Sequence, residues 1–287
     1  MKVKVLSDSS CDILSDEKIG FSSVPFNITT SEKNYVDDIN LDVEAMINDF
    51  KKYKGKSSTA CPGVGLWLNE MEGADEVYII TMTSGISGTF NSASIAKEMY
   101  LEDHPNAKVA VYDTLSTAAE ETLVVEKALE LVKTDNTFEE NCKIIEDYIK
   151  HTRLFFTLES IRNFAQNGRV SKAVASLVSI LGITIFGTAS HEGTLEPISK
   201  CMKYKQALKA LIDNLNEAGF DGGRVIITHV KNEKKALLVR DEILKYFPTS
   251  EIKIYKARGL CSYYAELGGV LIGVECKNEY EKIYKNH

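Results

Sequence analysis

Residues 77–93 read VYIITMTSGISGTFNSA, and this stretch decides the fold. The apolar, branched run from Glu76 to Met82 has the length of a buried strand. A turn with two glycines and several hydroxyl groups follows it, and a helix is predicted to begin near Gly88. A strand that runs directly into a helix indicates an α/β protein with a mainly parallel sheet.

The flanking segments repeat this alternation. Apolar runs of strand length occupy Lys2–Leu6 and Lys108–Tyr112, and apolar residues at helical spacing occupy Leu41–Tyr53 and Ser116–Val132. We therefore expect an N-terminal α/β domain over residues 1–155, built on a doubly wound, mainly parallel sheet.

The second half is less regular. A strand at Leu154–Leu158 precedes two further strand candidates, Ile183–Phe186 and Leu195–Ser199, which a polar turn joins. The remaining expected elements are helices over 204–216 and 234–246 and strands over 224–230, 251–257 and 270–274. This order predicts an α+β domain over residues 156–287, with the ligand site in the crevice between the two domains.

Composition narrows the class of protein. The chain has 287 residues, of which 44% are hydrophobic and 26% charged, as in globular proteins. The 34 basic residues are mixed among 41 acidic ones, without the basic stripe that nucleic-acid binding needs. Six scattered cysteines without a C-x-x-C indicate neither a zinc site nor a disulfide framework, and we expect no metal and no cofactor.

Two features of the sequence indicate where in the cell the protein is located. The amino terminus lacks the long apolar stretch of a signal peptide, so we expect a cytoplasmic protein. Residues 173–190 carry no charge and approach the length of a membrane span, but polar residues interrupt them. A half-buried helix followed by a strand fits this pattern better than a transmembrane segment.

The turn after the central strand is the first candidate site. A helix that begins near Gly88 presents unpaired N–H groups and a partial positive charge, which suit a carboxylate or a phosphate. Ser84 and Ser87 could add hydroxyl donors, although either serine could instead only cap the helix. The spacing is not that of a nucleophile elbow, and no P-loop is present.

Two other segments carry polar candidates. The hydroxyl-rich segment Lys56–Gly63 reads as a turn, in which Thr59 could face a ligand or, as the residues alone favour, cap the following helix. Arg169 follows a flexible glycine, as a counter-charge or lid would, whereas an exposed position is the usual one for arginine. Asp8 and Asp12 follow the first strand, where a capping role is favoured over metal binding.

Taken together, these motifs resemble the DegV family. The resemblance covers nearly the whole chain in order, and its most specific part is the serine-glycine block. The matching segments are residues 8–12 (DSSCD), 58–62 (STACP), 84–93 (SGISGTFNSA), 167–170 (NGRV) and 227–229 (ITH).

The resemblance implies a non-catalytic, two-domain protein that holds one long-chain fatty acid. By this likeness Thr59 and Ser87 are the ligands of the fatty-acid carboxylate, with Ser84 and Gly88 in the same loop and Arg169 near the head group. In family members that serve a fatty acid kinase, a separate ATP-binding subunit converts the bound acid to an acyl phosphate. The resemblance thus implies such a kinase subunit as a partner.

Two positions depart from the family pattern. Ala60 replaces the serine of the T-S-x-P motif, and Ala265 stands where kinase-associated members carry the histidine of an H-x-G-P-G stretch. An added acid, Glu266, follows it. The resemblance therefore supports lipid binding more fully than it supports the kinase partnership.

Burial of an acyl chain supplies the affinity in this interpretation. About 14 to 16 methylene groups at roughly 0.8 kcal/mol each give on the order of 10 kcal/mol before ordering costs. The aliphatic wall is expected among residues of the uncharged segment, although ordinary core is the favoured role for any single one of them: Val174, Leu177, Val178, Leu181, Ile183, Ile185 and Phe186. Two alternatives remain open, an enzyme that acts on a small carboxylated or phosphorylated metabolite at the same site and a regulatory module whose lipid tunes a partner.

Overall fold

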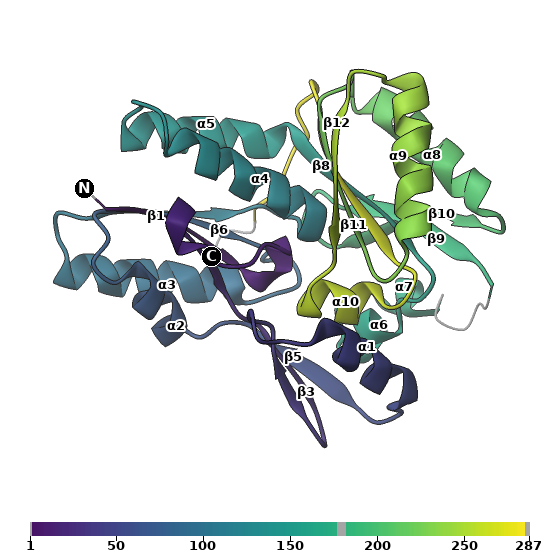
Figure 1. The fold of residues 1–287 in the computed structure, drawn as a ribbon, viewed down its shortest axis with the longest axis horizontal. Coiled ribbons are helices and arrows are strands. Elements are labelled where there is room, and N and C mark those ends of the chain that lie inside the picture. The colour runs from purple at the N-terminus through teal and green to yellow at the C-terminus, as the bar shows by residue number, and fades with distance from the viewer. Residues whose placement is uncertain (1, 177–181, 285–287) are drawn as a thin grey trace.

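Four parallel strands form the N-terminal sheet, in the order β2-β1-β6-β7 (Figure 1). The computed structural model describes residues 2–176 and 182–284. The central strands are apolar runs that become fully buried, as the sequence predicts for a parallel sheet. The four strands are β1 (Val3–Asp8), β2 (Phe21–Val24), β6 (Glu76–Thr81) and β7 (Lys108–Asp113).

Helices cover both faces of this sheet. Val77 and Ile79 of β6 pack in the cluster that includes α2 (Val64–Met71) and α3 (Thr89–Asp103). Tyr78 and Ile80 point to the opposite face, where α4 (Ala118–Leu131) and α5 (Phe138–Lys150) lie. The predicted doubly wound arrangement is confirmed.

A six-stranded mixed sheet follows, in the order β10-β9-β8-β13-β11-β12. Only β11 and β12 run parallel, and the other neighbours pair antiparallel. Helices α8 (Tyr204–Glu217) and α9 (Glu233–Tyr246) cover its outer face, so the predicted α+β character of this half is confirmed (Figure 1). The strands are β8 (Thr152–Leu158), β9 (Thr184–Ala189), β10 (Leu195–Cys201), β11 (Arg224–His229), β12 (Glu251–Lys256) and β13 (Val270–Glu275).

Helix α4 lies between the two sheets and is buried around most of its circumference. Such burial is typical of a helix that belongs to two cores at once. It approaches β13 so closely that a Cβ atom at Gly273 would lie 2.3 Å from the carbonyl oxygen of Ala119. Only glycine fits that position of the strand, and the apolar residues on both sides of α4 form one continuous cluster.

Two carboxyl groups at the buried end of β1 share one hydroxyl group. Ser10 Oγ lies 2.7 Å from Asp8 Oδ1 and also contacts Glu121 Oε2, on α4. A hydroxyl donates a single hydrogen, so the second contact needs a proton on one of the carboxyl groups. Burial raises the pKa of Glu121 well above its ordinary value and raises the pKa of Asp8 as well. The shared hydroxyl and the raised pKa values both favour a proton held between Asp8 and Glu121.

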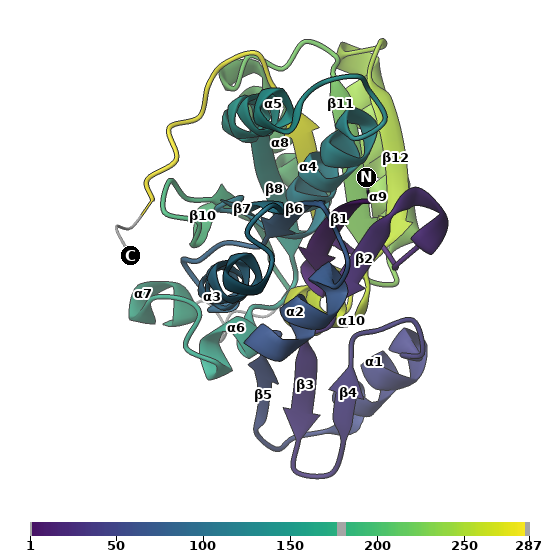
Figure 2. The same cartoon turned by 90° about the vertical axis from the view of Figure 1, so that its left-hand side faces the viewer.

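Residues 27–60 form a small lobe beneath the two sheets (Figures 1 and 2). Its strands β3 (Asn27–Thr30), β4 (Asn34–Val36) and β5 (Ser57–Ala60) pair antiparallel beside α1 (Val43–Lys52). The prediction of a turn over Lys56–Gly63 is therefore wrong for its first half. Strand β5 is polar because it lies at the edge of a small, half-exposed sheet, and its hydroxyl residues imitate a turn.

Short elements connect these parts. They are the 3₁₀ turns η1 (Ser9–Cys11) and η2 (Glu17–Ile19) and the helices α6 (Arg162–Gln166), α7 (Lys172–Ala175) and α10 (Gly259–Ala265). The helix expected from Ala173 onward is described only as α7, because residues 177–181 lie outside the described part of the chain.

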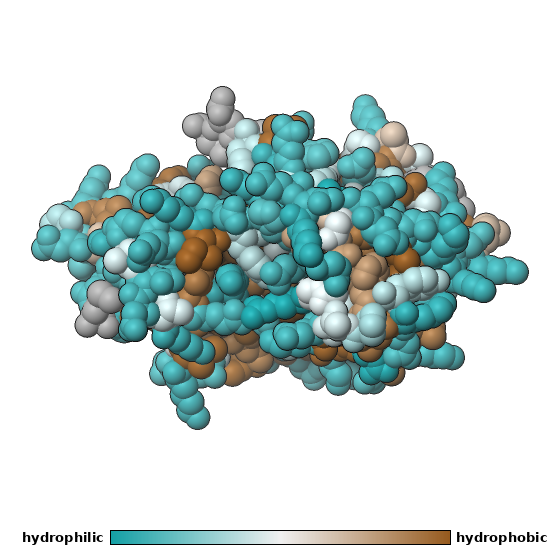
Figure 3. Space-filling view, turned by 90° about the horizontal axis from the view of Figure 1, so that it is seen from above, coloured by the Kyte–Doolittle hydropathy of each residue, from teal (hydrophilic) through white to brown (hydrophobic). Residues whose placement is uncertain are grey.

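Over residues 2–176 and 182–284, no helix combines the length and apolar character that crossing a bilayer demands. Seen from above, the surface is mostly hydrophilic, with small, separate apolar patches (Figure 3). The chain passes from the first large sheet to the second between Lys150 and Thr152. The division into domains at residue 155 stays a prediction, since α4 packs against both sheets.

Replacing Gly273 by alanine should destabilise the protein. The added methyl group would press on the α4 backbone, and such overpacking costs about 1–3 kcal/mol. We expect thermal unfolding to occur several degrees lower. The control is Gly65→Ala, in α2, where a Cβ atom meets nothing within 4 Å and helix propensity favours alanine. Equal melting of Gly273→Ala and the parent protein would contradict the close α4–β13 contact.

Replacing Glu121 by glutamine should change how stability depends on pH. A carboxyl group with a raised pKa in the folded state stabilises that state below its unfolded pKa, about 4.3 for glutamate. This stabilisation is lost as the pH rises toward the folded-state pKa, and the glutamine side chain has no such loss. We expect the melting temperature of Glu121→Gln, relative to the parent protein, to increase between pH 5 and pH 8.

Melting curves at each pH measure this difference. Glu130→Gln, on the exposed side of the same helix, serves as the control for loss of a surface carboxylate. If the difference in melting temperature between Glu121→Gln and the parent protein stays constant with pH, the shared proton is refuted.

Candidate functional site

The serine-glycine loop, residues 83–88, leaves the carboxyl end of β6 and is held by the strands on either side. Asp8, at the end of β1, accepts a hydrogen bond from the backbone N–H of Met82 at 2.9 Å. Asp113, at the end of β7, accepts one from the backbone N–H of Ser84 at 3.2 Å. Because β6 lies between β1 and β7, the two carboxyl groups fix the loop from both sides.

The turn between β9 and β10 packs against the same loop. A Cβ atom at Gly85 would lie 2.3 Å from the carbonyl oxygen of Glu192. One at Gly193, whose φ is +71°, would lie 2.0 Å from Thr83 Oγ1. Side chains are thus excluded where the two halves of the protein meet, and the second half supports the loop directly.

Helix α3 begins at the end of this loop. Its N-cap is Gly88, which provides no side-chain hydrogen bond. Ser87 Oγ accepts a hydrogen bond from the N–H of Thr89 at 3.3 Å, a long contact that leaves the hydroxyl hydrogen available to a ligand. The prediction that the helix begins near Gly88 is confirmed, and the partial positive charge of its first turn lies beside Ser87.

Thr59 lies on strand β5. Its hydroxyl is hydrogen-bonded to the Tyr264 hydroxyl at 2.8 Å, and two residues earlier the Ser57 hydroxyl is hydrogen-bonded to that of Tyr263 at 2.7 Å. Ser58, between them, is exposed, as strand alternation requires. The expectation that Thr59 caps α2 is therefore wrong, because the N-cap of that helix is Gly63.

Arg169 follows α6 through Gly168, which takes the left-handed conformation with φ of +66°. Its Nη1 donates to the carbonyl oxygen of Asn167 at 2.9 Å. Asn167 in turn donates from Nδ2 to the Tyr263 hydroxyl at 2.8 Å. Arg169 is half-buried rather than free on the surface.

One cavity of about 230 Å³ brings most of the predicted site residues together. Thr59, Ser87, Gly88 and Arg169 all line it. Ser84 does not; it lines an adjoining open groove of about 570 Å³ that also borders Ser87, Gly88 and Arg169. The rest of the cavity lining is mainly apolar: Phe26, Ala60, Cys61, Met82, Ile86, Leu260 and Tyr264.

The electrostatics of this cavity favour neutral donors. Burial raises the pKa of the Cys61 thiol and of the Tyr264 phenol, so both stay protonated at neutral pH. The cationic side chain in the lining is Arg169, at the border with the groove. An anion in the cavity would thus meet hydroxyl groups first and a guanidinium at the edge.

Three contributors were missed by the sequence analysis. Tyr264 belongs to α10, a segment in which the sequence predicts no element, and Asp113 follows a predicted strand without an expected role. Asp8 was expected only to cap, and it does accept from the N–H of Ser10 at 3.1 Å, but it also holds Met82. The available signal is that an aspartate comes just after each of two predicted strands, Lys2–Leu6 and Lys108–Tyr112.

The members of the predicted aliphatic wall that the structure describes do not line this cavity. Ile183 and Ile185 lie in the core between the sheets, and Phe186 packs on the opposite face of the second sheet. Val174 packs partly against the first of these clusters, and Leu177, Val178 and Leu181 lie outside the described residues. The β-strand alternation of β9 sends these side chains into two cores.

Glu266, the acid next to the departure from the family pattern at Ala265, does not line the cavity. Glu266 Oε1 accepts hydrogen bonds from Ser160 Oγ at 2.8 Å and from the N–H of Asn163 at 3.1 Å. It therefore faces the start of α6. Ala265 itself is buried.

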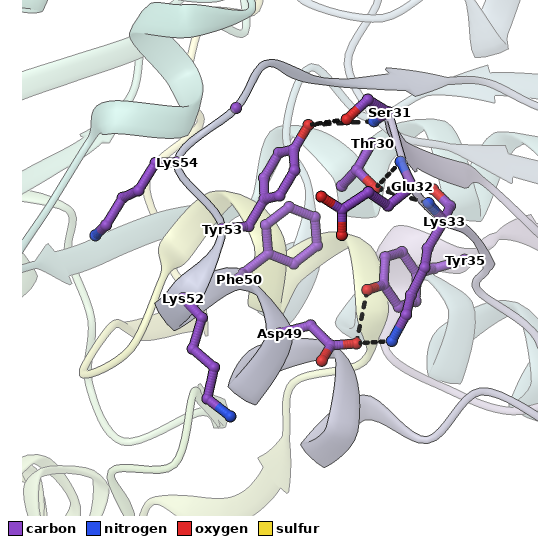
Figure 4. A pocket seen from close by; sticks show the side chains of 11 residues that line it. Thr30, Ser31, Glu32, Lys33, Tyr35, Asp49, Phe50, Lys52, Tyr53 and Lys54 are labelled. Carbon is purple, nitrogen blue, oxygen red and sulfur yellow. Dashed lines mark hydrogen bonds and ion pairs between the residues drawn. The ribbon is translucent and has the colours of Figure 1, made fainter.

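A separate hollow of about 460 Å³ lies on the outside of the small lobe (Figure 4). Asp49 there binds Lys33 Nζ at 2.6 Å and the Tyr35 hydroxyl at 2.9 Å. Tyr53 accepts from the N–H of Ser31 at 3.1 Å. These polar groups satisfy one another, so this hollow is not the candidate site.

Comparisons with known proteins agree with the motifs. The family model described as "Uncharacterised protein, DegV family" matches residues 2–275. A DegV domain-containing protein of Streptococcus pneumoniae is 39% identical over 279 residues, which are 96% of this chain and 99% of that protein. One from Streptococcus gordonii is 36% identical over the same share of this chain and 99% of its own length.

Two solved structures resemble the fold closely. A DegV family protein from Eubacterium eligens, loaded with heptadecanoic acid, has a TM-score of 0.92 at 44% identity, covering 96% of this chain and 100% of its own. The fatty acid kinase B3 protein of Streptococcus pneumoniae, loaded with linoleic acid, has a TM-score of 0.93 at 38% identity, with the same coverage.

Proposed function

Because this chain belongs to the DegV family, we propose that it binds one long-chain fatty acid, with the carboxylate at Thr59 and Ser87. The observation that carries the proposal is the single cavity in which these two hydroxyl groups meet an apolar lining. Relatives of 38% and 44% identity hold linoleic and heptadecanoic acid, which supports the same class of ligand here.

The head group is held by neutral donors. The Tyr264 hydroxyl can donate to Thr59 Oγ1, which frees the threonine hydrogen for a carboxylate oxygen. Ser87 supplies the second hydroxyl, and the first turn of α3 at Gly88 adds its partial positive charge. Such donors avoid the desolvation cost of a fully buried ion pair.

The tail requires the apolar lining to move. The cavity of about 230 Å³ is smaller than the roughly 300–1,000 Å³ of typical ligand pockets. Met82 and Leu260, in the apolar cluster beneath the head-group site, are the side chains that repack around the acyl chain. Methionine suits this role because its unbranched side chain adapts at low cost.

The chain binds the acid rather than transforming it. Its cavity offers hydroxyl groups and one guanidinium, and the Cys61 thiol is a poor nucleophile because burial raises its pKa. The bound acid would be presented to a fatty acid kinase subunit in the cytoplasm. The groove of about 570 Å³ beside Ser87 and Arg169 gives such a partner a route to the carboxylate.

Native mass spectrometry of freshly purified protein tests the proposal. We expect a mass increment of one fatty acid, which added palmitate or oleate replaces. Ile86→Trp should remove this increment, because the indole fills the cavity that Ile86 lines. The variant should keep its lipid-free melting temperature, since Ile86 lies in a half-buried loop position. An absent increment in the parent protein, with no binding of either added acid, would refute fatty-acid binding.

The head-group assignment is tested with Thr59→Ala combined with Ser87→Ala. Hydrogen bonds to a charged group contribute about 1.5–3 kcal/mol each, so loss of both should lower the fatty-acid affinity by about two to four orders of magnitude. Fluorescent fatty-acid displacement measures the affinity. Ser58→Ala, the exposed neighbour on the same strand, is the matched control and should bind like the parent protein. Unchanged affinity in the double variant would reject these two ligands while leaving lipid binding itself in place.

A further inference from the structure

The parallel strands β11 and β12 end side by side, at an edge that the proposed fatty-acid site does not use. His229 and Lys256 are paired in register at the last position of the two strands. Lys231 and Arg258 follow two residues after each of them. The carboxyl ends of neighbouring parallel strands are the usual place for ligand binding in α/β sheets.

A cavity of about 380 Å³ lies at this edge. Helix α1 forms one wall with Val43, Glu44 and Ile47, and the strand ends and the start of α10 form the others. The cavity shares no lining residue with the one that contains Thr59 and Ser87. The remaining lining residues are His229, Lys231, Glu233, Lys256, Ala257, Arg258 and Ser262.

His229 is oriented as a hydrogen-bond donor. The side chain is buried, with 4% of its surface exposed, and its Nδ1 lies 3.1 Å from the backbone nitrogen of Asn232. Nδ1 accepts that hydrogen bond, so the ring proton of the neutral imidazole is on Nε2. Burial also lowers the pKa of His229, which keeps the ring neutral. Nε2–H therefore remains to serve a ligand.

The cationic side chains around the cavity exceed the acidic ones. Lys231 Nζ contacts Glu44 Oε2 at 3.2 Å, and this ion pair is weak because the Glu44 side chain is 71% exposed. Lys256 has no ion-pair partner within the described ranges. Arg258 donates from Nη2 to the carbonyl oxygen of Asp38, but its Nε is buried without a hydrogen-bond partner. Glu233 is the other acid in the lining, and Asp12 and Asp37 act on Arg258 from outside it. The unpaired Lys256 and the weakly paired Lys231 favour an anion.

We propose that this cavity is a second binding site, which takes the oxyanion of a small phosphate monoester or carboxylate through Lys231, Lys256 and His229. The apolar side chains of Val43 and Ile47 then contact the nonpolar part of the ligand. Two ammonium groups and one imidazole N–H match the several acceptor oxygens of such a group. The site is independent of the fatty-acid head group.

Histidine NMR signals test the proposal directly. The full-length protein is titrated with sodium phosphate, with sodium acetate and with sodium chloride at matched ionic strength. The His229 signal is assigned from its loss in His229→Gln. We expect phosphate or acetate to shift this signal saturably and chloride to leave it in place. The oxyanion that saturates the shift of the His229 signal at the lower concentration identifies the ligand class.

Lysine variants separate the site from general surface charge. Lys231→Ala combined with Lys256→Ala should raise the midpoint of the titration at least tenfold. Lys234→Ala, an exposed position on the first turn of α9 outside the cavity lining, should change it less than twofold. Unshifted signals of the other histidines show that the variants stay folded. A His229 signal that neither oxyanion moves, or equal weakening in the control variant, would overturn the proposal without affecting fatty-acid binding.

Discussion

The fold depends on the burial of α4 between the two large sheets. A helix that serves two cores cannot slide along either sheet, because Gly273 fixes its approach on one side and Ser7 and Ser10 hold Glu121 on the other. Glu120 is also buried, and Lys282 Nζ lies 2.6 Å from its Oε1. Removing one partner of such a pair leaves an uncompensated buried charge, which is far more costly than the pair itself is favourable. The position of α4 is therefore set by polar contacts as well as by packing.

The position of α4 also affects the candidate site, through residues at the ends of the strands of the first sheet. Asp8 shares Ser10 with Glu121 of α4, and the same Asp8 holds the backbone of Met82 at the start of the serine-glycine loop. On the other side, the N–H of Thr83 donates to the carbonyl oxygen of Ser116, just before α4, at 2.7 Å. The loop that carries Ser87 is thus fixed by the central helix and not only by its own glycines. Preorganised hydroxyl groups bind an anion better than mobile ones, because less ordering entropy is lost on binding.

The sequence predicted those parts of the structure that short-range pattern determines. Strand β6 and the start of α3 are evident because an apolar run and a glycine-rich turn stand next to each other. Strand β5 was mistaken for a turn, since Ser57, Ser58 and Thr59 become a strand only by pairing with β3 some thirty residues earlier. Tyr264 could not be found at all from pattern. Its helix is seven residues long, and its place in the cavity depends on contacts with residues more than two hundred positions away.

Helix α10 shows how such distant contacts join the two cavities. Asp37, in the small lobe, accepts hydrogen bonds from the N–H groups of Gly259 and Leu260 at 2.8 Å each and so anchors the start of the helix. Arg258 and Ser262, at that end, line the cavity beside His229. Two residues beyond Ser262, Tyr264 meets Thr59 in the proposed fatty-acid site. The hydrogen-bonded backbone of this helix holds Arg258, Ser262 and Tyr264 in fixed positions relative to one another. The Asp37 contacts therefore fix one short helix whose residues line both cavities, so the geometry of each cavity depends on the same anchor.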